Sequence, residues 1–478
     1  MRLSAILDRS RCIAPPGYDR WRVPPAALAI HLAIGQVYAF SVFNLPLSRL
    51  IGITDSAPGD WKLTTIGWIF SVAIVFLGLS AFTFGHWLED AGPRKAMFAS
   101  ATCFGGGFLI AALGAQLHQI WVVYLGYGVI GGIGLGLGYI SPVSTLIKWF
   151  PDRPGMATGL AIMGFGGGAM IGSPLAVALM DLFKSPANTG VAPTFAAMGV
   201  IYFVFMMFGV ATVKLPAPGW IAPGFTGPRV SSEGEPITAP RVGTPAGRSF
   251  FQRRRTAKDV HVDVALRTRP FWLLWAVLCL NVTAGIGVLG QASPMIQEMF
   301  PSAISPAAAA GFVGLLSIAN MAGRFVWSSA SDYIGRRNTY MVYFVLGAIL
   351  YALVPSTGRA ANVVLFVVAY AVIISMYGGG FATIPAYLRD VFGVMHVGAI
   401  HGRLLTAWSV AGVAGPVLVN YLREYQIAHG VARADAYTAT MYIMAGLLAI
   451  GFVANALVGD VDPKYHFAAA PGATEAGA

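Results

Sequence analysis

The segment Gly85-His86-Trp87-Leu88-Glu89-Asp90-Ala91-Gly92-Pro93-Arg94-Lys95 has a counterpart in the second half of the chain, Ser331-Asp332-Tyr333-Ile334-Gly335-Arg336-Arg337. An offset of 243 residues relates Glu89 to Asp332, Gly92 to Gly335 and Arg94 to Arg337. The same offset relates three further pairs: Gly136 and Gly379, Pro142 and Pro385, and Gly172 and Gly415. A constant offset between matched residues indicates that the chain consists of two copies of one unit.

The composition around the two copies is that of a membrane protein. The 478 residues are 56% hydrophobic and 11% charged, whereas a soluble domain carries about 25% charged residues. The apolar residues form long blocks separated by short polar breaks, which is typical of segments that cross a bilayer. This composition excludes a disordered chain. It also argues against nucleic-acid binding as the reason for the net charge of +11, because basic residues mark the cytoplasmic side of membrane proteins.

Twelve apolar blocks are long enough, at about 20 residues each, to cross a bilayer as helices. Six of these spans separate the members of each repeated pair, and because six is even, both copies have the same orientation in the membrane. The predicted fold is therefore an all-α integral membrane protein whose twelve transmembrane helices form two parallel-repeat six-helix bundles. We place the spans at 24–47, 63–87, 96–115, 120–147, 156–180, 193–213, 270–296, 307–327, 339–355, 362–387, 404–423 and 436–459.

The spans divide the chain into tails, bundles and a central loop. With this topology 24 of the 31 Lys and Arg residues lie on the side of the termini, 6 lie on the opposite side, and Arg324 lies within a span. The positive-inside rule then places both termini in the cytoplasm. We interpret the run Arg253-Arg254-Arg255 as part of this bias, with anionic-lipid contact as the alternative. The predicted parts are a cytoplasmic N-terminal tail (1–23), an N-terminal six-helix bundle (24–214), a cytoplasmic central loop (215–269), a C-terminal six-helix bundle (270–460) and a cytoplasmic C-terminal tail (461–478).

The repeated segment, between spans two and three and again between spans eight and nine, resembles the loop signature of the major facilitator superfamily. An acid at this position can contact a helix N-terminus or a neighbouring arginine, and glycine permits a tight turn. We predict that these residues latch one conformation; the alternative is a charged turn that only fixes the topology. The predicted latch residues are Gly85, Glu89, Asp90, Gly92, Arg94, Lys95, Asp332, Gly335, Arg336 and Arg337.

A more specific resemblance is carried by Tyr38-Ala39-Phe40-Ser41-Val42-Phe43, Gly136-Leu137-Gly138-Tyr139-Ile140-Ser141-Pro142, Tyr377-Gly378-Gly379-Gly380-Phe381 and Gly402-Arg403-Leu404-Leu405. Together these segments resemble the oxalate/formate antiporter family, which is related to the monocarboxylate transporters. The resemblance implies a secondary transporter of small carboxylate anions that works by alternating access, with a substrate-binding arginine in the eighth span. We expect a monomer in the plasma or inner membrane of the cell.

Arg324 needs an explanation independently of any family, because it lies inside the eighth predicted span. A charged side chain at the centre of a membrane helix costs about 2.5 to 3.5 kcal/mol on insertion scales. No span centre supplies a carboxylate to compensate it, so an anionic substrate is the expected partner, since a guanidinium offers two parallel donors to a carboxylate. The alternative is that Arg324 extends toward the membrane surface, where Asp332 follows eight residues later.

The remaining substrate-site residues are predicted as an aromatic and polar surround for Arg324. Aromatic walls with a few hydroxyl donors suit a small planar carboxylate, because they limit the volume and fix the orientation. Each aromatic residue taken alone is as well explained by packing, so only the set has weight. The predicted binding residues besides Arg324 are Gln36, Tyr38, Tyr139, Asn320, Tyr377, Phe381 and Trp408.

Two replacements narrow the expected substrate and coupling. Dicarboxylate carriers of the resembled family have a lysine in span eleven, but 404–422 contains none and Trp408 stands near the expected place. This favours a monocarboxylate such as formate, pyruvate or lactate over oxalate. Proton-linked monocarboxylate carriers place an aspartate where this chain has Asn320, so exchange is favoured over proton symport unless His31 takes the proton.

Other classes of function fit the sequence less well. An intramembrane enzyme would need convergent catalytic side chains in the spans, and a membrane sensor would need a soluble output domain. A sugar or drug carrier remains an alternative within transport. We expect no cofactor, no metal site and no nucleic-acid partner, and the glycine runs around 131–138 and 164–168 are interpreted as helix packing rather than nucleotide binding.

Overall fold

The computed structural model describes residues 7–222, 229–230, 236–237, 259–289 and 291–466. Almost all of the regular structure in these ranges is helical. The predicted basic run Arg253-Arg254-Arg255 and most of the predicted central loop lie outside the described residues. Within the described part of that loop, β1 (Arg229–Val230) and β2 (Pro236–Ile237) form a two-residue antiparallel pair.

The first half of the chain runs through six membrane-length helical segments. Pro and Gly bound many of them: α5 and α8 each begin with proline, which suits a helix start because its missing N–H has no intrahelical partner there. After the short turns η1 (Arg9–Cys12) and η2 (Arg20–Arg22), the segments are α2 (Pro24–Ile34) continued by η3 (Gly35–Phe43) and α3 (Asn44–Leu47); α4 (Leu63–Ala91); α5 (Pro93–Gln116); α6 (Ile120–Val123) continued by the π-helical η4 (Tyr124–Gly131) and α7 (Gly132–Trp149); α8 (Pro154–Phe183); and α9 (Val191–Thr212).

The second half repeats this order. A short helix, α10 (Val262–Ala265), leads into it, and η5 (Pro463–Tyr465) follows it. The segments between them are α11 (Arg269–Leu289) with α12 (Ala292–Met299); α13 (Pro306–Ile334); α14 (Arg336–Arg359); α15 (Val363–Phe392); α16 (Val397–Leu404) with α17 (Thr406–Ala428); and α18 (Thr438–Ala456).

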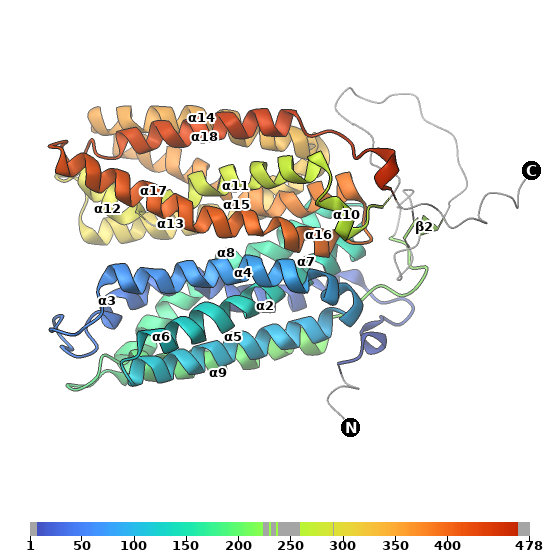
Figure 1. Ribbon diagram of the computed structural model, residues 1–478, viewed down its shortest axis with the longest axis horizontal. Helices are drawn as coiled ribbons and strands as arrows, with labels where there is room; N and C mark the ends of the chain where they lie inside the picture. Colours follow the sequence, from blue (N-terminus) through green and yellow to red (C-terminus); the bar gives the residue numbers. More distant parts are fainter. Residues whose placement is uncertain (1–6, 223–228, 231–235, 238–258, 290, 467–478) are drawn as a thin grey trace, which may run out of the picture.

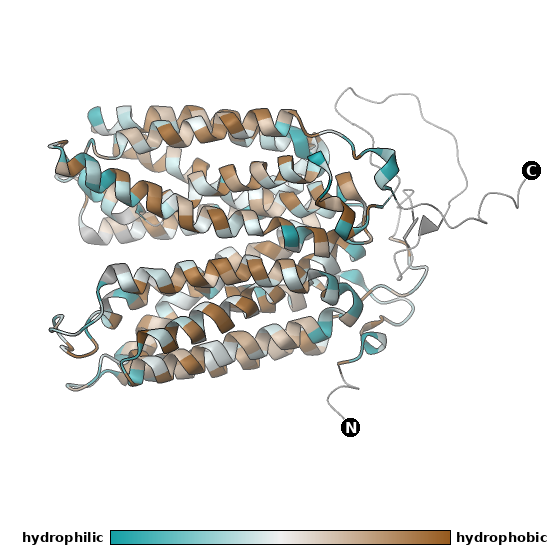
Figure 2. Cartoon of the chain, viewed as in Figure 1, coloured by the Kyte–Doolittle hydropathy of each residue, from teal (hydrophilic) through white to brown (hydrophobic). Residues whose placement is uncertain are grey.

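The helices have the length and polarity of membrane spans. Among the described residues, eleven helices are long and apolar enough to cross a membrane. The 29-residue α13, which carries Arg324, coincides with the eighth predicted span, so all twelve predicted spans fall on helical segments. Figure 2 shows the hydrophilic residues gathered at the two ends of the helices, while hydrophobic colours dominate between them. The predicted all-α membrane fold is confirmed.

Figure 1 shows the helices of the first half and those of the second half as two groups that lie side by side, with the first and the last described segments of the chain, around η1 and η5, at the same end of the molecule. We call this end the termini side. The repeat is visible in the backbone as well: Gly92 and Gly335 have φ values of 83° and 86°, and each ends one helix and begins the next. A left-handed conformation is accessible to glycine without steric cost, so the repeated turn requires glycine at both positions.

Glycines allow the two halves to approach closely where α8 packs against α13. A Cβ added to Gly159 would meet the backbone oxygen of Arg324 at 2.9 Å, and one added to Gly166 would lie 3.1 Å from the Cα of Met321. Small residues at such contacts let helix backbones approach, which is a major source of helix association in membranes. This close contact supports the packing interpretation of the glycine run at 164–168.

Candidate functional site

Arg324 lies in α13 with its side chain fully buried, at 0% exposed. Its Nε donates a hydrogen bond to Oδ1 of Asn320 at 3.0 Å, and its Nη1 donates to the backbone oxygen of Ile162 in α8 at 3.3 Å. The hydroxyl of Tyr38 also interacts with the guanidinium, but within the described residues no acceptor meets hydrogen-bond geometry at Nη2. A buried charged donor without an acceptor is costly, so an anion would gain most at Nη2.

The charge of Arg324 has no acidic partner in the described ranges. The ion pairs of these ranges involve other basic side chains. Asp332, the acid toward which Arg324 could have extended, contacts Arg336 and α8 instead. The guanidinium therefore stays in the interior between the two halves.

Aromatic rings from both halves enclose the guanidinium. Its carbon lies 5.4 Å from the centroid of the Phe165 ring and 5.5 Å from that of Phe381, within cation–π range. Trp408 packs at 4.5 Å from Phe381 and 5.5 Å from Phe165. Such walls exclude water, and in a low-dielectric surround the attraction between a cation and an anion is stronger than in solution.

Tyrosine hydroxyls add polar groups to this cluster. The hydroxyls of Tyr38 in η3 and Tyr377 in α15 lie 3.1 Å apart and so connect the two halves. Tyr139 in α7 packs 5.4 Å from Trp408, and its buried hydroxyl has no hydrogen-bond partner among the residues that the structure describes. A buried hydroxyl in this state can donate to a carboxylate oxygen.

The structure thus brings together seven predicted residues: Arg324, Asn320, Tyr38, Tyr139, Tyr377, Phe381 and Trp408. It does not bring Gln36 to them. Gln36 accepts a hydrogen bond from the Tyr127 hydroxyl at 3.1 Å and packs next to Gly172, both inside the first half. Positions two apart in a 3₁₀-helix differ by about 240°, so Gln36 and Tyr38 point to different sides of η3.

Two residues of the cluster were missed by the sequence analysis. Phe165 contacts Arg324, and its ring lies 5.1 Å from that of Tyr38. The sequence contains a feature that could have identified Phe165, because it is the one aromatic side chain in the run Gly164-Phe165-Gly166-Gly167-Gly168. His401 in α16 is fully buried 5.8 Å from the ring of Tyr139, and neither of its nitrogens has a hydrogen-bond partner in the described ranges.

His31, considered as a proton carrier, is hydrogen-bonded to the backbone. Its Nδ1 contacts the oxygen of Ala161, and its Nε2 lies 3.1 Å from the oxygen of Tyr139. Two carbonyl oxygens are both acceptors, so the ring can donate to both only when it is protonated. The contacts place His31 in the packing between α2, α7 and α8, next to the cluster.

On the termini side, Asp332 joins the two halves. Its carboxylate accepts hydrogen bonds from the backbone N–H groups of Gly155 and Met156, both at 2.9 Å, at the N-terminus of α8. It also pairs with Arg336, which in turn lies 3.4 Å from Asp390. A carboxylate at a helix N-terminus is favoured by the helix dipole and by the unpaired N–H groups there.

Glu89, the repeat counterpart of Asp332, lies at the corresponding place in the other half. It forms an ion pair with Lys148 at 2.8 Å, and its Oε1 lies 2.5 Å from the position that a Cβ on Gly398 would take, in the first turn of α16. Gly85 also faces α16, since its added Cβ would lie 3.0 Å from the Cα of Ala399. These residues therefore lie between the halves, as Asp332 does.

The other predicted latch residues lie within one half. Arg94 donates to the backbone oxygen of Val210 at 3.0 Å, and Arg337 donates to that of Ala456, so the two equivalent arginines each tie a helix start to the last helix of their own half. Asp90 is exposed beside His86, and Lys95 lies in the first turn of α5.

The chain is similar to known transporters in sequence and in fold. The family model of the Major Facilitator Superfamily matches residues 26–328 and 292–475. The oxalate:formate antiporter of Oxalobacter formigenes is 24% identical over 396 residues, covering 82% of this chain and 81% of that protein. The apicoplast pyruvate carrier 1 of Toxoplasma gondii is 25% identical over 385 residues, covering 73% and 68%. A crystal structure of the transporter FucP in the outward conformation superposes with a TM-score of 0.62 at 12% identity, covering 92% of this chain and 99% of that one.

Proposed function

The chain belongs to the Major Facilitator Superfamily, and from this membership we propose that it exchanges small carboxylate anions across the membrane, with monocarboxylates such as formate, pyruvate or lactate preferred. It is a multi-pass membrane transporter rather than an enzyme. The observation that carries the proposal is the fully buried Arg324, whose Nη2 lacks a hydrogen-bond partner and which pairs with no carboxylate in the described part of the chain. A carboxylate substrate supplies both the missing charge and the missing acceptor.

The surround of Arg324 supports a substrate with one carboxylate. In the described cluster the aromatic rings of Phe165, Phe381 and Trp408 line the guanidinium, and no second Lys or Arg side chain contacts them. A dicarboxylate would bring a second negative charge into this apolar surround without a counter-charge, which is unfavourable. A monocarboxylate leaves only a small uncharged group to be accommodated.

Similar proteins support the substrate class. One relative is an oxalate:formate antiporter and another is a pyruvate carrier, and both names describe small carboxylates. Oxalate and formate exchange is therefore the second candidate function, favoured by the first of these relatives. We prefer monocarboxylates because Arg324 is the one basic side chain that contacts the aromatic rings of the described cluster.

The hydrogen bonding of Asn320 supports exchange. The amide of Asn320 accepts from Arg324 Nε, and an amide carries no titrating proton. The positive charge of Arg324 is thus not neutralised by a neighbour that could release a proton. In an exchanger the substrate itself neutralises this charge in each direction of the cycle.

The contacts at the termini side support alternating access. We propose that this side faces the cytoplasm, in agreement with the distribution of Lys and Arg, and that the protein resides as a monomer in the inner or plasma membrane. Asp332 bridges the halves there, and the substrate cluster lies deeper between them. The latch residues would release when the halves rock apart, which opens the cluster to the cytoplasm.

Counterflow in proteoliposomes tests the proposal. The purified protein is reconstituted in vesicles preloaded with formate, pyruvate, lactate or oxalate, and uptake of the labelled anion is measured. We expect exchange of at least one monocarboxylate and a loss of apparent affinity of about 10- to 100-fold in Arg324→Gln, since a hydrogen bond to a charged group contributes about 1.5 to 3 kcal/mol. Arg359→Gln, which changes an exposed arginine at the end of α14, is the matched control.

Each contrary outcome has a definite meaning. Exchange of oxalate in preference to every monocarboxylate would contradict the single-cation argument and favour the second candidate function. Unchanged exchange in Arg324→Gln would remove the basis of anion selection and favour a sugar or drug carrier. Absence of flux for any small anion in folded protein would favour a membrane sensor.

A further inference from the structure

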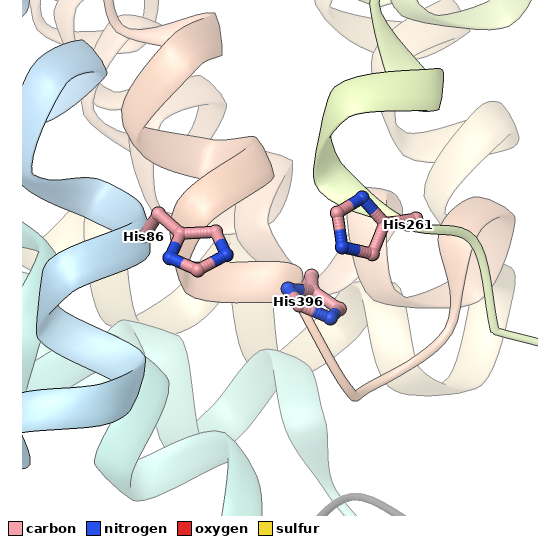
Figure 3. A group of neighbouring side chains, drawn as sticks. All are labelled: His86, His261 and His396. Carbon is pink, nitrogen blue, oxygen red and sulfur yellow. The ribbon is translucent and has the colours of Figure 1, made fainter.

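Three histidines that are far apart in the sequence meet on the termini side of the structure. Figure 3 shows His86, His261 and His396 facing a common space from three different segments. One potential ligand atom from each lies within 4.8 Å of those of the other two. His86 is on α4 of the first half, His261 is the N-cap of α10 in the segment that joins the halves, and His396 is the N-cap of α16 in the second half.

The segments that carry His261 and His396 are held in place by their own contacts. Asp259 accepts hydrogen bonds from the backbone N–H groups of Val394 and Met395 at 2.6 and 3.2 Å, next to His396. Arg403 of α16 donates to the backbone oxygen of Val262 at 2.6 Å and pairs with Asp263 at 2.5 Å, next to His261. These two imidazoles, with ring centroids 4.7 Å apart, are therefore positioned before any ion binds.

Carboxylates stand beside two of the rings, in the position that orients a metal-binding histidine. His86 Nδ1 lies 3.3 Å from Asp90 Oδ2, and His261 Nδ1 lies 3.4 Å from Asp263 Oδ2. In metal sites the ring nitrogen that does not bind the ion typically donates its proton to a carboxylate. In His261 the Nδ1 also accepts from the backbone N–H of Asp263 at 3.2 Å, so ligation through Nε2 requires the ring proton to move to Nδ1.

We propose that His86, His261 and His396 form a binding site for a divalent transition ion of the Zn²⁺ class, and that the bound ion holds the termini side closed. Three imidazole ligands with water or a carboxylate in the fourth position are a coordination that Zn²⁺ adopts in proteins. At about 2.0 to 2.1 Å per Zn–N bond, tetrahedral ligands lie about 3.4 Å apart. The ligand atoms therefore approach one another by up to about 1.4 Å on binding, which side-chain rotation of the exposed His86 supplies.

The effect on the transport cycle follows from where the three ligands are attached. His86 moves with the first half and His396 with the second, so opening the termini side separates them. In the open form the three ligands are apart, so the ion binds the closed form more tightly. The bound ion therefore stabilises the closed form relative to the open form, and the stabilisation grows with the ion concentration. Binding of the ion at this site therefore inhibits the transport cycle, whichever substrate is carried.

Titration of the purified full-length protein with ZnCl₂, followed by calorimetry, tests the site. We expect one ion per chain and a dissociation constant at least tenfold weaker in His86→Gln and in His396→Gln, because each variant removes one of three ligands. His429→Gln, at an exposed histidine at the end of α17, is the matched control and keeps wild-type binding. His261→Gln replaces either variant if that variant does not elute as a folded monomer.

A second measurement tests the closing of the termini side without using transport. Ser328 is fully buried between α13 and α8, so a Ser328→Cys residue, in a background without the three native cysteines, reports opening by its reaction with a maleimide. We expect ZnCl₂ to slow this reaction at least fivefold, and only while His86 and His396 are present. If neither His86→Gln nor His396→Gln weakens Zn²⁺ binding, the proposed site is wrong. If Zn²⁺ binds but the maleimide rate does not change, the proposed closing of the termini side by the ion is wrong. Neither outcome depends on the proposed carboxylate exchange.

Discussion

At the scale of single residues, the central feature is a cation whose nearest protein partners are neutral. The amide of Asn320, the backbone oxygen of Ile162 and the aromatic rings all stabilise the guanidinium of Arg324 without cancelling its charge. In the proposed exchange, the remaining positive charge selects an anion, and the lack of a second cation limits the number of negative charges that the substrate can carry.

Trp408→Lys tests this limit. Trp408 packs against Phe381 and Tyr139, so a lysine at this position adds a second cation to the same cluster. We expect the ratio of oxalate to formate counterflow to rise at least tenfold, because the second carboxylate of oxalate then gains a counter-charge; one such contact is worth about 1.5 to 3 kcal/mol. Competition between the two labelled anions in proteoliposomes measures the ratio. Trp408→Phe is the control. Loss of all flux in Trp408→Lys, with flux kept in Trp408→Phe, would contradict the expectation that the cluster accommodates a second cation.

At the scale of elements, the N-terminus of α8 is held by an acid from the other half. Asp332 of α13 accepts from the N–H groups of Gly155 and Met156, while the glycines of α8 let the two helices approach. The acid and the helix end belong to different halves, so in the proposed cycle this contact breaks when the termini side opens. Glu89, the repeat counterpart of Asp332, lies beside the first turn of α16 and pairs with Lys148.

Asp332→Asn weakens this contact and should shift the protein toward the form that is open on the termini side. A carboxylate at a helix N-terminus contributes up to about 2 kcal/mol in partly buried geometry, and one to two kcal/mol is a factor of about 5 to 30 in a conformational ratio. We expect the Ser328→Cys reporter to react with maleimide faster by that factor. Asp462→Asn, at an exposed acid near the C-terminus, should leave the rate unchanged. If the reporter reacts with maleimide at the same rate in Asp332→Asn and Asp462→Asn, Asp332 does not stabilise the closed form and only fixes the topology.

At the scale of the whole molecule, the part of the interface between the halves that surrounds Arg324 is hydrophobic and aromatic, and within the described residues no acidic side chain pairs with Arg324 there. In the described residues, the buried imidazoles beside the cluster around Arg324 are those of His31 and His401, and His31 contacts two backbone oxygens. The Tyr38–Tyr377 contact joins the halves without a charge. This surround of Arg324 agrees with the proposed exchange, in which the substrate rather than a proton accompanies the rearrangement.

An imposed inward pH gradient should therefore not drive uphill uptake. Vesicles that lack internal substrate are diluted into acidic buffer containing a labelled monocarboxylate, and accumulation above the external concentration is measured. We expect none in the wild type, while preloaded vesicles exchange at the same pH. Uphill accumulation that disappears in His401→Gln or His31→Gln would instead establish proton coupling through a buried imidazole.

The sequence by itself determined the architecture and the outline of the site. Span length and apolar composition are local properties, and the 243-residue offset is independent of packing, so the helices and the equivalent turns at Gly92 and Gly335 could be predicted. Arg324 was recognisable because a charge inside a membrane span requires compensation wherever the helix packs.

Only the tertiary structure decided which side chains meet. Gln36 and Tyr38 are neighbours in sequence, yet the rotation of η3 turns one toward Tyr127 and the other toward Tyr377. Phe165 contacts Arg324 because α8 lies against α13, and the three histidines converge only because the end of α4 and the beginnings of α10 and α16 lie together. The rotation and mutual approach of helices depend on contacts between residues that are distant in sequence. A local sequence pattern contains no information about those contacts.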